Sequence, residues 1–255
     1  MSVISKIKTL IWFLKNPSYY GQLFKLISQK ISGDPREDSR AESESWCNER
    51  AISTEEFLKD KTGQDLQPLK DLYPEKFSHA FQMAEESPVK MGGPGNIELV
   101  YFLSEHLQAT SVVETGVAYG WTTLSLLLSL NKREGSRLFS IDMPYAKMGN
   151  EDYVGCVVHD DLRSPWTLIR KPDQSGLEPA LKELGTLDLC HYDSDKTYNG
   201  RMWAYPRLWE KIRSGGYFVS DDIGDNVAFR DFCKQIDQEP VVLKYGQQYV
   251  GILSK

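Results

Sequence analysis

Acidic side chains gather in two short segments in the second half of the chain, each directly after a run of apolar residues. The first segment contains Asp193 and Asp195, and the second contains Asp221 and Asp222. Four carboxylates at neighbouring strand ends would repel one another unless a cation lay among them. Because a hard divalent ion such as Mg²⁺ suits a site of oxygen ligands, we expect at least two of the four to bind a metal ion. The alternative is that Asp195, Asp221 or Asp222 cap the helices that follow.

Lys196 stands three residues after Asp193, a spacing that lets its side chain reach the same pocket. A partly buried lysine beside a cation has a lowered pKa, which would make Lys196 a candidate general base. The alternative is a solvated lysine that takes no part in chemistry. On the first interpretation, Lys196 or Asp193 accepts a proton during the reaction.

A second candidate site is the glycine-rich segment that runs from Glu114 to Trp121. Gly116 permits a tight turn after a strand, and the helix N-terminus that follows favours an anionic group. A dinucleotide-binding fingerprint would need two further glycines, where this chain has Ala118 and the bulky Trp121, so NAD is disfavoured. The next strand ends at Asp142, an acidic residue well placed for ribose hydroxyls. The alternative is an ordinary strand-to-helix turn with Asp142 as a cap.

The elements that must position these residues alternate along the chain. The pattern predicts strands over residues 111–115, 137–141, 166–170, 187–192, 217–220, 241–244 and 249–253. It predicts helices over residues 97–107, 121–130, 177–184, 200–212 and 226–236. This alternation indicates an α/β fold with a doubly wound, mostly parallel, Rossmann-like sheet and helices on both faces. The last two strands form a pair that places one antiparallel strand at or near an edge.

The first 33 residues differ from the rest in charge and pattern. They contain five lysines and no acidic residue, although the whole chain carries a net charge of −6. Apolar residues recur at helical spacing over 2–15, Asn16-Pro17 breaks the pattern, and a second amphipathic helix follows with Ile31 near its end. We interpret residues 1–33 as a basic amphipathic helical arm. The arm either lies on an anionic membrane surface through residues 1–31 or packs on its own domain or across a homo-oligomer.

Residues 34–90 form a second unit between the arm and the domain that begins at residue 91. The segment 33–50 is acidic and without periodicity, so it is expected to be a linker. Residues 51–90 contain two helical patterns and are expected to form a small helical cap. Three glycines and a proline within residues 91–96 then predict a tight, backbone-exposing loop.

Composition narrows the class of protein. With 255 residues, of which 40% are hydrophobic and 26% charged, the chain is a folded globular protein and not a low-complexity one. The longest apolar run, Leu10–Leu14, is too short for a spanning helix or a signal peptide, which predicts a cytoplasmic protein, with peripheral contact at the inner face of a membrane as an extension. Its four cysteines are far apart, which disfavours zinc and disulfides. The acidic balance disfavours nucleic acid as a partner.

Taken together, residues 91–255 resemble a class I S-adenosylmethionine-dependent methyltransferase. They are similar to the branch that contains macrocin-type sugar O-methyltransferases and cephalosporin-hydroxylase-like proteins. The stretches that carry the resemblance are Val112–Thr123, Ser140–Asp142, Tyr192–Tyr198 and Gly215–Asp222.

The resemblance implies a pocket for S-adenosylmethionine. In that family the first glycine loop holds the methionine part of the cofactor, which corresponds here to Glu114, Gly116, Ala118 and Gly120. The acid after the second strand binds the ribose, which corresponds to Asp142. Ala118 departs from the family pattern, because the middle position of the loop is usually glycine.

The resemblance also implies a metal site. Relatives hold a divalent ion with one acid after the fourth strand and an acidic pair after the fifth, which correspond to Asp193, Asp221 and Asp222 binding Mg²⁺ or Mn²⁺. Some relatives have histidine where this chain has Lys196, whereas catechol-type methyltransferases place a lysine base at that spacing.

The leading functional hypothesis is metal-assisted O-methylation of a sugar, a glycan or a glycosylated metabolite, with Asp193 or Lys196 accepting the proton. A second hypothesis is a metal-dependent glycosyltransferase that uses Asp193-x-Asp195, although the glycine turn and Asp142 would then have no role. A third is a non-enzymatic membrane-associated scaffold that works through residues 1–31.

Overall fold

One mixed sheet organises the chain. The computed structural model describes residues 3–24, 27, 34–63, 65–144 and 149–255. The described part contains an eight-stranded sheet with the order β1-β7-β8-β6-β5-β2-β3-β4. Its strands are β1 (Ala51–Ser53), β2 (Ser111–Thr115), β3 (Arg137–Ile141), β4 (Trp166–Ile169), β5 (Leu187–Tyr192), β6 (Ile212–Ser220), β7 (Val241–Tyr245) and β8 (Gln248–Ser254).

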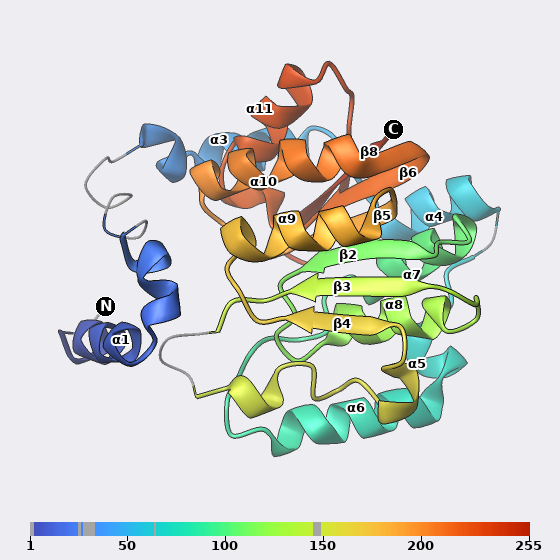
Figure 1. Cartoon of the computed structure of the whole chain (residues 1–255). Helices are drawn as coiled ribbons and strands as arrows, with labels where there is room; N and C mark the ends of the chain where they lie inside the picture. Colours follow the sequence, from blue (N-terminus) through green and yellow to red (C-terminus); the bar gives the residue numbers. More distant parts are fainter. Residues whose placement is uncertain (1–2, 25–26, 28–33, 64, 145–148) are drawn as a thin grey trace.

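The sheet confirms the predicted fold class. β8 runs antiparallel to β6 and β7, and the other pairings in the described sheet are parallel. β2 lies between β3 and β5, where the chain changes the direction in which it adds strands. The carboxyl ends of β2, β3 and β4 point to the same edge of the sheet (Figure 1). This edge at a topological switch point is where α/β sheets bind ligands.

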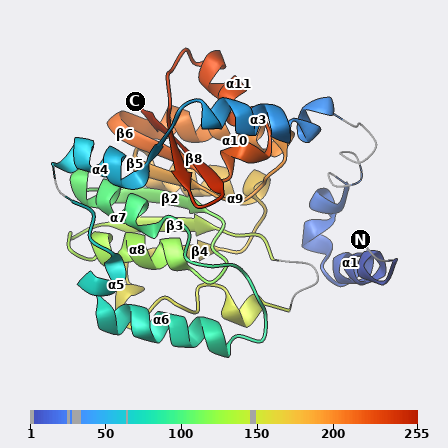
Figure 2. The ribbon, with the colours of Figure 1, turned by 180° about the vertical axis from the view of Figure 1, so that it is seen from behind.

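Helices cover both faces of the sheet and share two separate hydrophobic cores (Figures 1 and 2). The first core is built on α4 (Thr54–Thr62), α5 (Leu69–Leu72), α6 (Pro74–Glu86), α7 (Ile97–His106) and α8 (Trp121–Leu130). The second core is built on α9 (Asp173–Leu184), α10 (Tyr198–Lys211) and α11 (Ala228–Gln235). α8 is buried along its whole length except at Thr122, which agrees with a sequence that contains leucine, tryptophan, threonine and serine but no charged residue.

The segment expected to be a linker is helical instead, so that prediction is wrong. It contains the 3₁₀ helix η2 (Pro35–Asp38) and α3 (Arg40–Asn48). The Ser43 hydroxyl donates to the carbonyl oxygens of Ile223 (2.8 Å) and Asn226 (3.0 Å), and Cys47 is fully buried. Tertiary contacts, which a local pattern does not contain, therefore order this acidic stretch.

The expected boundary at residue 91 also leaves one strand of the sheet outside the predicted domain of residues 91–255. Residues 51–53, expected within the helical cap, form β1 and pair in parallel with β7. Much of the remainder of that segment is helical, as predicted, in α4, α5 and α6. The segment 91–96 lacks regular secondary structure up to the start of α7, as its glycines and proline predict.

The arm begins with α1 (Val3–Lys15), and the chain breaks at Asn16 and continues in the 3₁₀ helix η1 (Pro17–Tyr19), as predicted. Residues 20–24 are helical. The predicted positions Lys25, Lys30 and Ile31 lie outside the described residues. In the described residues, three further 3₁₀ helices lie in loops. They are η3 (Glu151–Tyr153) and η4 (Asp160–Leu162), between β3 and β4, and η5 (Ile223–Asp225), after β6.

Candidate active site

The turn after β2 has a backbone shape that requires glycine at two positions. Gly116 and Gly120 have φ values of +82° and +93°, in the left-handed region. A Cβ atom at Gly116 would run into the carbonyl oxygen of Asp193, and one at Gly120 would lie 2.9 Å from Cα of Gly155. Ala118, which replaces the usual middle glycine, also has a positive φ of +50°, at a cost of about 1 kcal/mol.

Glu114 lies beneath this turn and is fully buried. Its Oε2 accepts hydrogen bonds from Thr123 Oγ1 (2.7 Å) and Ser140 Oγ (2.5 Å), while Oε1 has no hydrogen-bond partner among the described residues. Burial raises the pKa of Glu114 to about 7, although the two hydroxyl donors oppose that shift. The carboxyl group thereby connects β2 to α8 and β3, and we infer that it stabilises the turn from below.

Asp142 follows β3 directly and lies beside the turn, where it is 3% exposed. Its Oδ1 accepts a hydrogen bond from the backbone N–H of Val117 (2.9 Å), and its Oδ2 forms an ion pair with Arg170. Arg170 also pairs with Glu151 (2.7 Å). The sequence analysis missed Arg170, although its place after the strand 166–169 marks it as a strand-end residue like Asp142.

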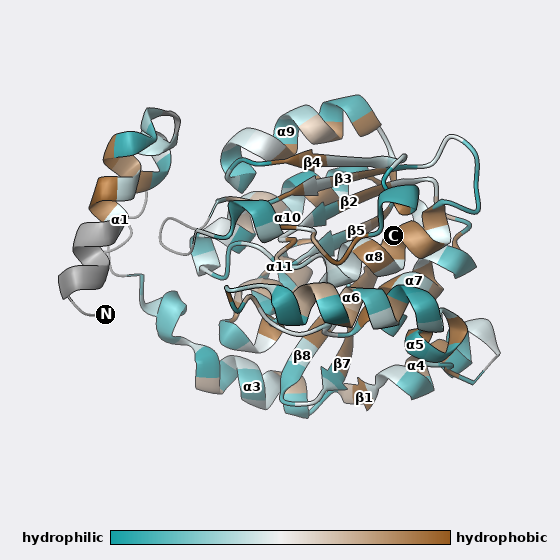
Figure 3. Cartoon of the chain, turned by 90° about the horizontal axis from the view of Figure 1, so that it is seen from below, coloured by the Kyte–Doolittle hydropathy of each residue, from teal (hydrophilic) through white to brown (hydrophobic). Residues whose placement is uncertain are grey.

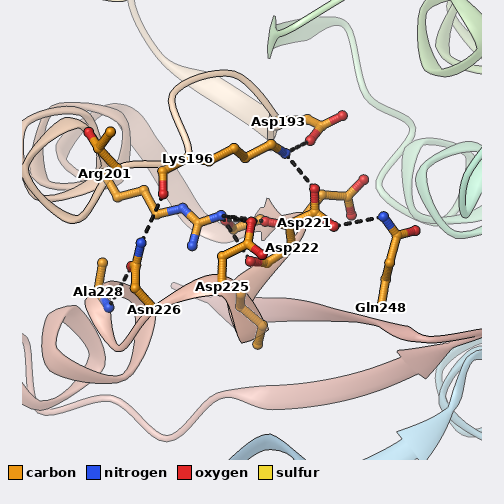
Figure 4. A network of polar contacts seen from close by, with 12 residues as sticks. Asp193, Lys196, Arg201, Asp221, Asp222, Asp225, Asn226, Ala228 and Gln248 are labelled. Atoms are coloured by element: carbon orange, nitrogen blue, oxygen red, sulfur yellow. Dashed lines mark hydrogen bonds and ion pairs between the residues drawn. The ribbon is translucent and has the colours of Figure 1, made fainter. Parts of the chain in front are cut away.

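The second cluster lies at the carboxyl ends of β5 and β6, with Lys196 at its centre (Figure 4). Lys196 Nζ forms an ion pair with Asp193 Oδ1 and another with Asp222 Oδ2 (2.8 Å). Burial alone would lower the pKa of Lys196, but the two carboxylates raise it. The expectation that the pKa of Lys196 falls is therefore wrong, and the side chain remains an ammonium group. Burial and the charge of Asp221 raise the pKa of Asp193 to about 6, against the opposing effect of Lys196.

Two cationic or titratable side chains, both missed by the sequence analysis, lie behind this cluster. His191 Nε2 is 3.4 Å from Asp221 Oδ2; burial lowers the pKa of His191, but Asp221 outweighs burial and raises it. Arg201 is fully buried and its Nη2 donates to the carbonyl oxygen of Asp222 (2.9 Å). Asp222 has a left-handed φ of +53°, which turns this corner of the chain toward Lys196. His191 lies within the predicted strand 187–192, directly before the acidic segment, whereas no local signal marks Arg201 as buried.

The donor set does not fit a divalent metal as it stands. Among the described residues, no group of three or more His, Cys, Asp or Glu side chains is arranged to hold a metal ion. The ammonium group of Lys196 takes the position between Asp193 and Asp222 that a cation was expected to take. Asp195 turns away to the start of α10, where its Oδ1 accepts from the backbone N–H (3.0 Å) and the hydroxyl (2.7 Å) of Thr197.

The glycine turn and the acidic cluster form one continuous site. The backbone N–H of Asp193 donates to the carbonyl oxygen of Thr115 (2.8 Å), and Ser194 Oγ donates to Thr115 Oγ1 (2.9 Å). Because β2 pairs with both β3 and β5, the structure brings Glu114, Gly116, Asp142 and Asp193 to one edge of the sheet. A ligand seated on the turn would lie beside Asp193.

Comparison with known proteins agrees with this geometry. Residues 113–223 match the model of a family described as a methyltransferase domain. A search of curated proteins gives no match.

Several solved structures are similar to the chain. An O-methyltransferase from Bacillus cereus in complex with SAH has a TM-score of 0.53 and 14% identity, covering 82% of this chain and 100% of its own. The O-methyltransferase TomG from Streptomyces achromogenes, involved in tomaymycin synthesis and solved with SAM, has a TM-score of 0.51 and 17% identity, covering 71% and 90%. A SAH-bound methyltransferase from Podospora anserina has a TM-score of 0.53 and 11% identity, covering 83% and 93%.

Proposed function

We propose that this chain, a class I S-adenosylmethionine-dependent methyltransferase by its domain match and its fold, methylates a hydroxyl group of a sugar, a glycan or a glycosylated metabolite. The observation that carries the proposal is the contact of Gly116 with the backbone of Asp193. It brings a cofactor-type glycine turn against a carboxylate that can accept a proton.

The residues on the turn fit S-adenosylmethionine. Asp142 offers a buried carboxylate to the ribose hydroxyls, and its bond with the Val117 N–H fixes its orientation. Gly116 and Gly120 let the backbone of the turn pack closely against Asp193 and Gly155, and the N-terminus of α8 that follows favours a carboxylate. When bound, the cofactor supplies an electrophilic methyl group on a sulfonium.

Asp193 is the residue we propose as general base. A carboxylate whose pKa is raised to about 6 remains largely ionised at neutral pH, yet it is a stronger base than an exposed aspartate. Lys196, held as an ammonium group, would fix the position of Asp193 and balance the charge of Asp222. Asp193, and not Lys196, is therefore the proposed proton acceptor.

The alternative is metal assistance, in which a metal ion and not the ammonium group of Lys196 supplies the positive charge between the carboxylates. Asp193, Asp221 and Asp222 are the residues that would hold Mg²⁺ or Mn²⁺ if Lys196 moved away. The ion pairs of Lys196 favour the metal-free arrangement, in which activity is unchanged by a chelator. Loss of activity in chelator, with recovery on adding Mg²⁺ or Mn²⁺, would establish the metal instead.

The choice of acceptor rests on the resemblance to sugar O-methyltransferases and on the similarity to solved O-methyltransferases. The glycosyltransferase alternative needs Asp193 and Asp195 to act together, but Asp195 is engaged by Thr197 at the start of α10. The proposal therefore keeps methyl transfer to oxygen as the reaction.

Calorimetric titration with S-adenosylmethionine tests the cofactor site. Asp142→Ala should lose ribose hydrogen bonds and weaken binding by about 1–3 kcal/mol. Asp193→Asn should bind the cofactor normally but transfer label from methyl-labelled S-adenosylmethionine about 10²–10⁴-fold more slowly. Unchanged affinity in the first variant or unchanged turnover in the second would refute the corresponding assignment.

A further inference from the structure

The arm exposes most of the large apolar side chains that the described surface leaves open. Nine such side chains are exposed in the described residues, and six of them belong to the arm. They are Leu10 (51%), Ile11 (45%), Leu14 (62%), Tyr20 (37%), Phe24 (68%) and Ile27 (46%). We call these six residues the apolar face of the arm. Grouped exposure of this kind marks a surface that meets something other than water.

Other aromatic side chains of the arm are packed against one another. Phe13 is fully buried, and the ring of Trp12 packs against those of Phe13 and Tyr19 with centroids 5.1 Å apart in both pairs. The arm thus has packed aromatic side chains of its own in addition to the exposed apolar face. Figure 3 shows apolar residues on α1, which lies apart from the sheet.

Charge indicates what the apolar face meets. Residues 1–33 carry five lysines and no acidic residue, whereas the chain as a whole is acidic. Apolar side chains on short helices with lysines beside them are typical of helices that lie in the interface of an anionic bilayer. No helix in the described residues has the length and apolar character needed to cross a bilayer.

The arm and the segment that follows it each contact the domain beside the candidate active site. Tyr19 Oη donates to the carbonyl oxygen of Arg170 (2.9 Å), the residue whose side chain pairs with Asp142. Glu37 accepts from the backbone N–H of Tyr198 (2.7 Å) at the start of α10. Figures 1 and 2 both show α1 beyond the carboxyl ends of β2, β3 and β4. Tyr19 and Glu37 thus both contact the chain at the edge of the sheet where the candidate site lies.

We infer that the apolar face of the arm docks on an anionic membrane and holds the active site at the bilayer surface, where the acceptor is a sugar carried on a lipid. The inference rests on the proposed function for the identity of the reaction. Docking through the arm brings the bilayer interface next to Arg170 and the glycine turn. A lipid-linked hydroxyl at that depth reaches the site without leaving the membrane.

Co-sedimentation with vesicles tests the docking. The full-length protein should bind vesicles of phosphatidylcholine with 30% phosphatidylglycerol, and binding should weaken as salt rises or when phosphatidylglycerol is left out. The triple variant Leu10→Glu, Leu14→Glu, Phe24→Glu should lose binding. The matched control Leu72→Glu, Phe81→Glu, Tyr245→Glu changes the three exposed apolar residues outside the arm and should bind like the parent. Lys15→Glu should weaken binding about fivefold or more.

Two results would overturn the docking. One is binding by the arm variant equal to that of the control, with both proteins folded by circular dichroism. The other is a parent dimer, measured by sedimentation equilibrium, that becomes a monomer in the arm variant and ignores anionic vesicles. That outcome would assign the apolar face to a second copy of the chain.

A pair of glycosides tests the acceptor. Dodecyl glycosides of common monosaccharides in the same vesicles should accept label faster than methyl glycosides in solution, and the arm variant should lose this difference while S-adenosylmethionine affinity is retained. Equal rates for the two forms would refute the lipid-linked acceptor. Cofactor binding without label in either form would contradict the proposed acceptor chemistry and leave the vesicle result to decide the docking.

Discussion

The two halves of the candidate site are built by different means. At the ends of β2 and β3, backbone shape dominates, because Gly116 and Gly120 leave no room for a side chain. At the ends of β5 and β6, charge dominates, because Lys196 holds Asp193 and Asp222 in ion pairs. A site defined by shape fails when one carbon is added, whereas a site defined by charge fails when one charge is lost or left unpaired.

Both halves nevertheless share one backbone feature. Ala118 in the first half and Asp222 in the second are non-glycine residues with a positive φ. Such residues persist where surrounding structure holds them in place, and they concentrate at functional sites. The two halves therefore differ in how their residues are held, and they share a non-glycine residue with a positive φ.

The largest effect is expected from Gly116→Ala, which tests the role of shape. The new Cβ overlaps the Asp193 carbonyl in addition to adopting a left-handed φ, so we expect a loss of about 4 kcal/mol or more in stability, or loss of cofactor binding. Gly135→Ala is the matched control, because Gly135 has a φ of +73° with open space around it. It should cost only about 1–2 kcal/mol. Equal unfolding midpoints in urea would show that shape does not distinguish this half.

A smaller effect is expected in the pH dependence of stability. It tests whether the half of the site at the ends of β2 and β3, which backbone shape defines, contains no buried charge. Because the pKa of Glu114 is raised to about 7 in the folded state, the free energy of unfolding should fall as pH rises from its unfolded pKa toward 7, and then level off. Between pH 5.5 and 8 the loss should be about 2 kcal/mol.

Glu114→Gln removes the titrating group and should flatten this dependence, while Glu134→Gln, at an exposed position, should leave it unchanged. Urea unfolding at the two pH values measures the difference. Identical slopes in both variants would mean that Glu114 titrates normally in the folded protein.

The smallest effect is expected at the helix cap beside the half of the site at the ends of β5 and β6, in comparison with a cap elsewhere. Thr197 Oγ1 accepts from the Gly200 N–H (3.0 Å) and caps α10, and Ser53 Oγ accepts from the Glu56 N–H (3.1 Å) and caps α4. Replacing either residue with alanine should cost about 1 kcal/mol in stability. Only Thr197→Ala should also lower methyl transfer, because Lys196 directly precedes the cap. An equal fall in turnover for both variants would show that the effect is global.

The sequence was sufficient for the core of the fold because its buried elements repeat a local pattern. The run Ser111–Thr115 and the apolar helix Trp121–Leu130 were predicted with the bounds that the structure has. α3 and β1 were not predicted, because Ser43 and Cys47 are ordered by residues far along the chain. A pattern of a few residues contains no information about such partners.

The candidate site divides in a similar way. The strand-end positions of Gly116, Asp142 and Asp193 follow from topology, so their convergence could be predicted. The pKa of Lys196 could not, because its sign depends on whether the nearest group is a metal ion or a pair of carboxylates. Arg170 was missed for a related reason. Its place in the site depends on its ion pair with the Asp142 carboxylate, and that ion pair depends on distance in space and not on distance along the sequence.

The pairing of β1 with β7 sets an order in which the molecule can assemble. β1 lies at the outer edge of the sheet and finds its partner only near the end of the chain (Figure 3). Close by, Tyr249 Oη donates to Asn48 Oδ1 across 201 residues of sequence (2.5 Å). Contacts that close such long loops form late and slow folding. During synthesis, residues 40–53 therefore have no pairing partner until the C-terminal strands leave the ribosome. A chaperone or a protease would bind the nascent chain at this stretch.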